Sequence, residues 1–306
     1  MKRMHQFSAL PLLMGSLLTG SAMAQEPTQH AIATSLDTAK IEQLTGAKGK
    51  LDSAENVFRV AVPRSDLAVS VAGVKMTAAT GFTSWASFTS AGDKTMVMGD
   101  MVLEEDQINT VMSTALDNGI EVTALHNHFL WDTPKVMFMH IGGMGDVDAL
   151  AIGIGKVFAK IQETSGTKTK SKPKSFDAAK TSLDPKPLEQ ILGVSLEKAG
   201  EVYKVTIGRT TQMDGHTVGK TMGVNTWAVF AGSDDKAIVE GDFAVLETEL
   251  QPVLKLLRAS GIAITTIHSH MVGESPRIVF LHYWGESRAS DLAKAFKSAL
   301  DTQTKS

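Results

Sequence analysis

The sequence predicts an α+β fold built from two similar domains, each an antiparallel sheet with helices packed on one face. Three observations lead to this prediction. A long stretch of the chain occurs twice, and a polar, Lys-rich segment separates the two copies. Within each copy, strand-like and helix-like segments do not alternate as they do in parallel βαβ units, which favours antiparallel pairing. With 43% hydrophobic residues among 306, the chain can bury ordinary cores.

The duplication is clearest around the histidines. The segment from His126 to His140 returns 142 positions later, from His268 to His282, and in both segments an His-x-His pair precedes a Pro-containing turn and a third His. The same offset aligns residues 73–143 with 215–285 without a gap. Identical pairs include Gly81/Gly223, Trp85/Trp227, Gly99/Gly241, Asp100/Asp242 and Pro134/Pro276. A repeat this long is typical of two similar domains rather than of a solenoid. We expect these domains at 25–165 and 185–306, with a linker at 166–184.

Each copy predicts the same order of elements: a short helix, three strands, a helix, the histidine hairpin and a closing helix. In the first copy the expected ranges are 37–45, 57–62, 82–89, 95–103, 104–118 and 146–164, with the hairpin before the last. In the second copy they are 186–192, 202–207, 224–231, 236–246, 247–260 and 287–302. Gly119 and Gly261 are expected to end the middle helices, and Pro252 is expected to delay or bend the start of the second one.

The first 24 residues are typical of a secretory signal peptide. Lys2 and Arg3 precede an apolar run, and Ala22-Met23-Ala24 matches the small-x-small cleavage pattern. No later segment is apolar for long enough to span a membrane, and the absence of Cys excludes a disulfide, a thiolate metal site and a lipidated N-terminal Cys. We therefore expect a periplasmic or secreted protein with no stable membrane anchor.

Charge and motifs exclude several classes of function. The formal net charge is −3, and residues 1–24 contribute two cations and no acid, so the mature chain is more acidic still. Nucleic acid is therefore not an expected partner, because neutralising phosphates needs a basic surface. The basic cluster at 168–174 is typical of a solvated linker. The sequence contains no phosphate loop and no Gly-x-Ser-x-Gly nucleophile motif.

The histidine hairpins predict metal sites. Side chains alternate along a strand, so His126 and His128 point to the same side, and pairing His126 with His140 would bring the third imidazole to that face. A register slip by one residue would send His140 to the other side. The expected ligands are His126, His128 and His140 in the first copy and His268, His270 and His282 in the second. Neutral imidazoles suit a divalent ion, with zinc as the first candidate and copper, iron or nickel as alternatives. Histidines that hydrogen-bond a polar core are the metal-free alternative.

Two pairs of carboxylates accompany the histidines. Glu105 and Glu247 precede the first His of each motif by 21 residues. Either could be a further ligand or the general base for water, and capping of the helix that each begins is the alternative. Asp100 and Asp242 each follow a Gly and could accept hydrogen bonds from ligand histidines, with a turn or bulge role as the alternative.

Four cations recur at related positions: Arg64, Arg209, Lys135 and Arg277. Placed near the histidines they would bind an anionic ligand, a carboxylate or a phosphate, and otherwise they are solvated surface charges. The second copy has Asp214-Gly215-His216 where the first has Ala72-Gly73-Val74. This difference indicates that the two halves are not functionally equal.

Three segments with their first-copy equivalents resemble the LppY/LpqO family of exported bacterial proteins: 241–245 (GDFAV), 267–271 (IHSHM) and 275–285 (SPRIVFLHYWG). The resemblance covers nearly the whole mature chain and implies a tandem duplication of a domain of unknown function. Some members look like lipoproteins, but this chain lacks the Cys that carries the lipid.

Three functional hypotheses remain. The first is an exported metal-dependent enzyme of the hydrolase type, with a small molecule as substrate. The second is a non-catalytic binding module for a metal ion or an anionic ligand of the cell envelope. In the third, the histidines form a structural cluster without metal.

Overall fold

A computed structural model describes residues 36–166, 177 and 180–304. The expected signal peptide at 1–24 lies outside the described residues, as does most of the expected linker. None of the helices in the described ranges is long and apolar enough to cross a membrane.

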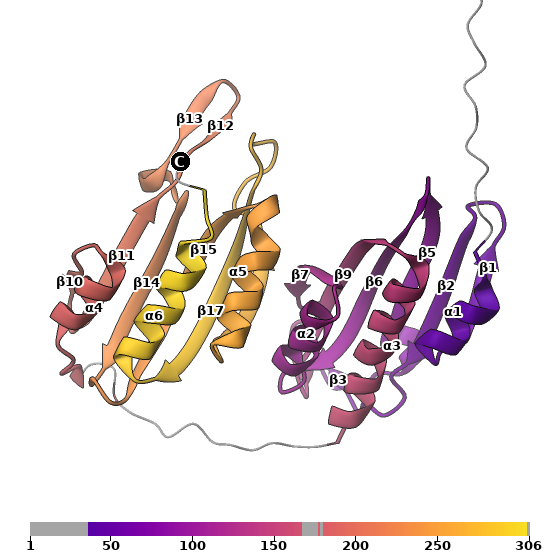
Figure 1. Cartoon of the computed structure of the whole chain (residues 1–306). Helices are drawn as coiled ribbons and strands as arrows, with labels where there is room; N and C mark the ends of the chain where they lie inside the picture. Colours follow the sequence, from indigo (N-terminus) through magenta and orange to yellow (C-terminus); the bar gives the residue numbers. More distant parts are fainter. Residues whose placement is uncertain (1–35, 167–176, 178–179, 305–306) are drawn as a thin grey trace, which may run out of the picture. The chain divides into compact units, whose positions relative to one another are not determined.

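Each half is an antiparallel sheet with its helices on one face (Figure 1), so the expected α+β class is confirmed. The first half comprises α1 (Thr38–Thr45), β1 (Gly49–Asp52), β2 (Val57–Pro63), β3 (Ser70–Val71), β4 (Val74–Lys75), η1 (Ala78–Thr80), β5 (Thr83–Ala91), β6 (Lys94–Glu104), α2 (Ile108–Asp117), β7 (Glu121–His126), β8 (Asp132–Thr133), β9 (Val136–Gly145) and α3 (Val147–Thr164). The second comprises α4 (Pro185–Leu192), β10 (Glu197–Ala199), β11 (Val202–Gly208), β12 (Thr211–Met213), β13 (His216–Val218), η3 (Lys220–Met222), β14 (Asn225–Gly232), β15 (Ala237–Leu246), α5 (Glu247–Ala259), β16 (Ala263–His268), β17 (Ile278–Ser287) and α6 (Ala289–Leu300).

The strand orders of the two halves mirror each other. The sheet runs β1-β2-β5-β6-β9-β7 and continues as β16-β17-β15-β14-β11-β10. The two series join where Ile267 of β16 pairs with Leu125 of β7. The side chain of Gln251 adds two hydrogen bonds there, to the backbone N–H and C=O of Val122. Whether each half is a domain with the boundaries expected from the sequence stays a prediction.

Side-chain alternation divides each sheet into two unlike faces. In β15, Val239, Phe243 and Val245 pack into the main apolar core under the helices, whereas Asp242 and Ala244 point the other way. The opposite face has smaller apolar clusters near the β12–β13 hairpin and near β3, β4 and β8. Because that face is covered only in part, polar side chains on it can meet solvent.

One expected helix start is wrong, and the delay expected from Pro252 does not occur. The helix α2 begins at Ile108 rather than at residue 104, because Glu104 is still paired with Val136 in the sheet and its N–H donates to the Gln107 side chain. The helix α5 begins at Glu247 without delay, so Pro252 lies inside it. Proline there removes one backbone donor, and four buried residues on one face of α5, Leu250, Val253, Leu254 and Leu257, hold the helix in place.

The histidine hairpin has a different register from the expected one. His126 pairs with Phe138 and Ala124 pairs with His140, whereas the expected register paired His126 with His140. A bulge interrupts β7 farther along, between Val122 and Ala124. The second hairpin repeats this, with His268 opposite Phe280. The shift is two residues, so it preserves the face of every side chain. His126 and His140 therefore share one face, as expected, and the ring of His128, which follows the strand, has its centroid 5.1 Å from that of His126.

The end of the first hairpin holds an unusual backbone. Trp131 has φ 62°, in the left-handed region that bulky residues avoid, and its side chain is 77% exposed. The equivalent residue of the second half is Gly273, with φ 89°. A non-glycine residue in this region costs roughly 1–2 kcal/mol. Glycine occupies the equivalent position in the second half. The largely exposed side chain of Trp131 buries too little surface to offset the cost of its backbone conformation.

Two substitutions test this strain. Trp131→Gly should be more stable than Trp131→Ala by about 1 kcal/mol, because only glycine adopts a positive φ without steric cost. Chemical denaturation of both variants measures the difference in the free energy of unfolding. At an ordinary extended position alanine would be the more stable of the two, so that order would contradict the backbone described here.

Candidate metal centre

Four side chains of the second half converge on the sheet face that lies opposite the helices. Asp242 comes from β15, His268 ends β16, and His282 lies on β17 directly opposite Asp242. His270 follows two residues after β16. Leu281 and Tyr283 belong to the main core on the helix side, so alternation points His282 to the open face.

The distances between the potential ligand atoms are short enough for these side chains to share a metal ion. The Nε2 atom of His270 lies 3.1 Å from Nε2 of His268 and 3.3 Å from Oδ2 of Asp242. Potential ligand atoms of these three residues all lie within 4.8 Å of one another. Nε2 of His282 lies 4.0 Å from the same carboxylate oxygen, and its ring stacks on that of His268 with centroids 5.0 Å apart. Asp242, His268 and His270 could therefore hold a metal ion.

Local contacts set the protonation of the imidazoles. His282 uses Nδ1 to donate to the Gly241 carbonyl at 3.1 Å, which leaves the lone pair of Nε2 directed at the cluster when the ring is neutral. Burial, together with the neighbouring His282 and His270, lowers the pKa of His268 to about 4. His268 is thus neutral near pH 7, and the neutral imidazole is the form that binds metals.

Two buried polar atoms of the cluster have no hydrogen-bond partner among the described residues: Oδ1 of Asp242 and Nδ1 of His268. Asp242 is only 2% exposed, and burial raises the pKa of its carboxyl, although His282 and His270 oppose this. A buried carboxylate oxygen without a donor is costly, and a cation at Oδ1 would remove that cost. The donor set of two imidazoles and a carboxylate therefore fits a zinc-like ion.

Glycine next to the carboxylate makes the close approach of the strands possible. A Cβ atom at Gly241 would lie 2.0 Å from the Trp227 carbonyl oxygen and 2.4 Å from the Tyr283 hydroxyl. The Tyr283 hydroxyl donates to that same carbonyl at 2.9 Å. Any larger residue at 241 would push apart the strands on either side of Asp242. Gly99 meets the Trp85 carbonyl in the same way in the first half.

Aromatic rings frame the cluster. The ring of His270 lies flat on Phe280, with centroids 3.4 Å apart, and Trp227 meets His282 edge-on at 6.4 Å. The Lys204 ammonium lies 4.8 Å from the centre of the Trp227 ring. These contacts limit the rotation of the imidazoles and place a cation at the side of the site.

The first half repeats the shape with fewer polar contacts. His126 stacks on His140 at 5.0 Å and His128 lies on Phe138 at 3.4 Å. Asp100 pairs with His140 across the strands and also has a buried Oδ1 without a hydrogen bond. Burial lowers the pKa of both His126 and His128. Among the residues with assigned positions, only the second-half group meets the distance criterion for a metal site.

The structure does not bring the expected glutamates to the histidines. Glu247 is the first residue of α5 and faces Arg277, with 3.9 Å between its Oε1 and the arginine Nε. It lines a cavity together with Val279, which lies on the helix side of β17, whereas His282 lies on the other side. Glu105 is exposed in the turn between β6 and α2. The carboxylate of the cluster is Asp242 instead.

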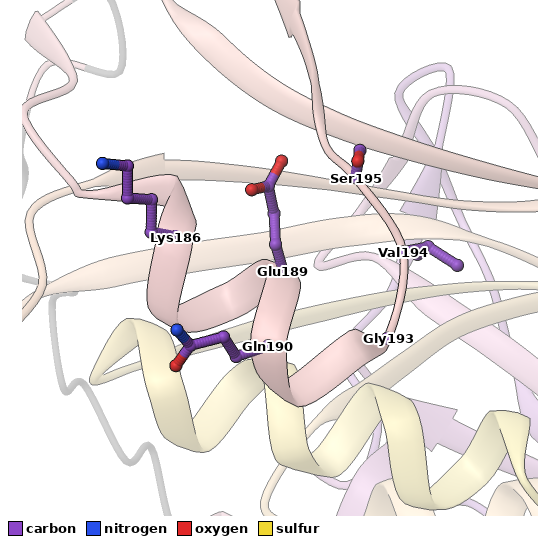
Figure 2. Close-up of a pocket in the computed structure, with 6 residues that line it drawn as sticks. All are labelled: Lys186, Glu189, Gln190, Gly193, Val194 and Ser195. Carbon is purple, nitrogen blue, oxygen red and sulfur yellow. The ribbon is translucent and has the colours of Figure 1, made fainter.

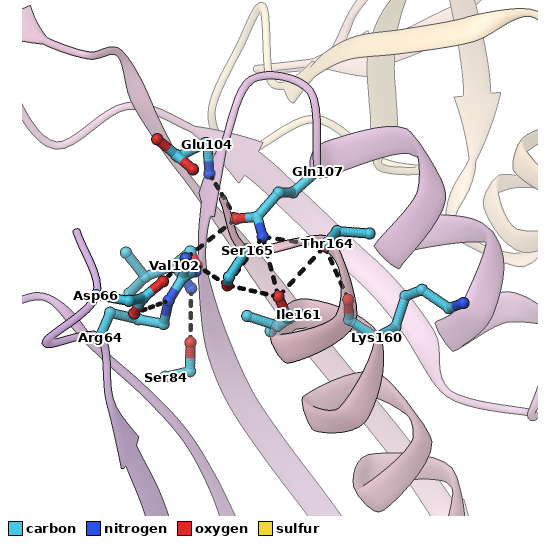
Figure 3. A network of polar contacts seen from close by, with 10 residues as sticks. All are labelled: Arg64, Asp66, Ser84, Val102, Glu104, Gln107, Lys160, Ile161, Thr164 and Ser165. Carbon is cyan, nitrogen blue, oxygen red and sulfur yellow. Dashed lines mark hydrogen bonds and ion pairs between the residues drawn. The ribbon is translucent and has the colours of Figure 1, made fainter. Parts of the chain in front are cut away.

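Arg64 and Arg209 are buried and already occupied by partners. Arg64 binds both oxygens of Asp66 at 2.9 Å, and it donates to the Val102 carbonyl and to Gln107 (Figure 3). Arg209 pairs with Glu249 and donates to the Ala244 carbonyl. Both arginines tie the end of a strand to the next helix, a structural role that uses their donors.

Lys135 and Arg277 lie in the connections of the two hairpins and are exposed. Of the four cations expected to bind an anion, only these two expose their charged groups to solvent.

The shallow cavities of the helix ends do not include the histidines. A cavity of about 360 Å³ at the end of α4 is lined by Lys186, Glu189, Gln190, Gly193, Val194 and Ser195 (Figure 2). Glu189 already accepts the Leu196 N–H at 2.8 Å. The corresponding cavity in the first half contains Glu42, which accepts the Gly49 N–H at the same distance. Both carboxylates therefore serve the turn after the helix.

The sequence pointed to Asp242 only as a hydrogen-bond partner or a turn residue. Its role as a candidate ligand depends on pairing with His282 and on burial beside Trp227, which spacing along the chain does not reveal. The available signal was the repeated Gly-Asp pair at 99–100 and 241–242.

Comparisons with known proteins agree with the duplication. A family model described as Domain of Unknown Function (DUF1259) matches residues 39–160 and again residues 186–302. No curated protein matches the chain. A solved structure described as "Crystal structure of a trimeric bacterial microcompartment shell protein PduB" is 12% identical, covering 83% of this chain and 89% of that chain. Its TM-score of 0.21 is too low to support any conclusion. The tandem duplication of an uncharacterised domain is confirmed, and the resemblance to LppY/LpqO stays a prediction.

The buried pair of Arg209 and Glu249 predicts acid sensitivity. Burial by itself would raise the pKa of Glu249, but hydrogen bonds from Arg209, Thr304 and Leu246 outweigh it and lower the pKa from 4.5 to about 2. Because the folded pKa lies below the unfolded one, this stabilisation is complete above about pH 4.5 and is lost as the pH falls toward 2.

Glu249→Gln copies Gln107, the residue of the first half, and should remove that pH dependence. We expect the variant to lose about 1–3 kcal/mol of stability at pH 7 and to differ less from the native protein at pH 3. Urea midpoints between pH 3 and 7 measure this, with Glu247→Gln as the control for an exposed glutamate. Curves that stay parallel down to pH 3 would contradict the assignment.

Proposed function

Because this chain belongs to the family described as Domain of Unknown Function (DUF1259), we propose its function from the geometry of the site: it binds a divalent transition metal ion, zinc first, through Asp242, His268 and His270. The observation that supports this best is the buried Oδ1 of Asp242, which has no donor among the described residues. The other oxygen of this carboxylate lies 3.3 Å from Nε2 of His270, and that nitrogen lies 3.1 Å from Nε2 of His268. Copper, iron and nickel are alternatives that accept the same ligands.

Each residue of the cluster has a distinct part in this proposal. His268 and Asp242 are the inner ligands, because each holds a buried polar atom without a hydrogen-bond partner. His270 is the outer ligand, positioned by its contact with Phe280. His282 faces the same carboxylate and is held by the Gly241 carbonyl, so it supplies a third imidazole and a candidate fourth ligand. That the first-half histidines form a second set of metal ligands remains a prediction. These are His126, His128 and His140.

We propose hydrolase-type chemistry as the use of this ion. A bound divalent ion supplies Lewis acidity toward water or toward an anionic or carbonyl oxygen of a small molecule. The side chains of His270 and His282 are 36% and 42% exposed, so the outer side of the cluster is open to such a molecule. Lys204 at the side of the cluster would favour an anionic one. A non-catalytic module that stores or carries the metal is the alternative.

Export from the cytoplasm is part of the proposal. Its support is the sequence of residues 1–24, and in a periplasmic or secreted setting histidine and carboxylate must do the work of metal ligation in a chain without Cys. Nucleic acid is not a proposed partner, because the chain is acidic overall.

Metal analysis tests the binding site. Protein purified without a histidine tag and reconstituted with Zn²⁺ should retain about one tightly held ion per chain in the second half, and saturating zinc should raise the Tm by roughly 5–10 °C. The double variant His268→Ala/His270→Ala should lose both effects, because it removes two of three ligands.

The matched control is His126→Ala/His128→Ala, which makes the same change at the equivalent positions of the first half. It should leave the second-half ion in place. If the second-half variant keeps its zinc, or if its metal-free Tm falls steeply while the native protein binds no metal, the histidines are structural and the proposal is wrong.

Spectroscopy of the Co²⁺-loaded protein separates an enzyme site from a closed one. A site with an open coordination position should change its visible absorption when azide is added, since the anion can enter as a ligand. Lys204→Ala should weaken the azide effect without removing the metal. A spectrum that does not respond to azide would indicate a closed site and favour the storage alternative.

A further inference from the structure

The end of the first hairpin gathers exposed apolar side chains. Val74 and Leu130 are each 64% exposed and Trp131 is 77% exposed. The backbone brings these residues together, because Val71 of β3 pairs with both Val74 and Asp132, and the Ala72 N–H donates to the Trp131 carbonyl at 3.3 Å. We call Val74, Leu130 and Trp131, with the exposed lysines Lys75 and Lys135, the first-half tip.

The second half has a different residue at every one of these positions, although Val272 is still apolar and Arg277 is still a cation. His216, Thr217, Val272 and Gly273 stand where the first half has Val74, Lys75, Leu130 and Trp131, and Asp214 adds an acid. The Pro and His residues of the two hairpins, by contrast, are identical. The second half therefore lacks the tryptophan and one of the two cations of the tip, whereas it keeps the histidines and the proline.

The conformation and exposure of Trp131 do not contribute to the stability of the fold. It holds a left-handed backbone that the other copy gives to Gly273, and most of its side chain faces solvent. Ala72, whose N–H binds the Trp131 carbonyl, also has a positive φ of 48°. Strained residues with exposed apolar side chains are typical of contact sites, because the contact is what offsets the strain.

The chemistry of the tip decides the partner. Three apolar side chains cannot supply the roughly 800 Å² per partner of a stable protein interface. A lipid surface needs less, since Trp and Leu enter the interface between headgroups and acyl chains and nearby lysines add attraction to anionic lipids. Lys75 and Lys135 flank the apolar residues, while the carboxylate of Asp132 is engaged by the Val136 N–H at 2.8 Å.

We propose that the first-half tip inserts reversibly into the surface of an anionic bilayer, with Trp131 as its main anchor. Binding of this kind differs from a stable anchor, because a small apolar tip with two lysines holds a protein only weakly. The contact does not depend on metal at the second-half site.

Vesicle binding tests the proposal with the mature chain. The protein should cosediment with phosphatidylglycerol–phosphatidylethanolamine vesicles and bind phosphatidylcholine vesicles less. Trp131→Gly should reduce partitioning about tenfold, because it removes the largest inserted side chain. Since this variant adopts the residue of the second half, it should fold, and a cooperative thermal transition checks that it does.

Further variants separate the components of binding. Val272→Ser changes the exposed apolar residue of the second half, which is 93% exposed, and should leave binding unchanged. Lys75→Glu/Lys135→Glu should reduce binding to anionic vesicles while leaving the weak binding to neutral ones.

Three results would overturn the proposal: no binding by the native protein to anionic vesicles, equal binding by Trp131→Gly, or an equal loss in Val272→Ser. Self-association in solution that Trp131→Gly abolishes would also overturn it, by assigning the tip to a second copy of the chain.

Discussion

The candidate site depends on the alternation of side chains between the two faces of the sheet along β15 and β17. One set of side chains on these strands enters the core under the helices, and the intervening set, which includes Asp242 and His282, is turned to the open face. A carboxylate in the centre of a sheet is thereby enclosed by neighbouring strands and still adjoins a surface where imidazoles can gather.

Parity explains why sequence reasoning succeeded for the histidines. A register that was wrong by two residues still placed His126 and His140 on the same face, because every even shift preserves the face. Side-chain alternation does not predict which charged side chains are buried. Arg64 and Arg209 looked like exposed cations, but each is enclosed among partners that come from distant parts of the chain. The three small strands β3, β4 and β8 were missed because two-residue strands leave no periodic pattern.

Duplication makes each half a reference for the other. Where both copies agree, as at Asp100 and Asp242, the shared residue serves a common requirement of the hairpin face. Where they differ, the difference separates the halves: Glu249 replaces the neutral Gln107 beside a buried arginine, and Gly273 replaces Trp131. The polar cluster with ligand distances lies in one half and the apolar tip lies in the other. Such a division is typical of a duplicated chain in which the two copies have taken separate tasks.

The glycine before each buried aspartate gives the site a mark that can be read without a structure. Since a side chain at position 241 would collide with the Trp227 carbonyl, a related sequence can retain the enclosed carboxylate only if it retains Gly241 as well. A Gly-Asp pair followed at a fixed interval by His-x-His and a third His is therefore a diagnostic pattern for sorting relatives. Sequences that keep the histidines but have lost the glycine would be expected to have abandoned the carboxylate ligand during divergence.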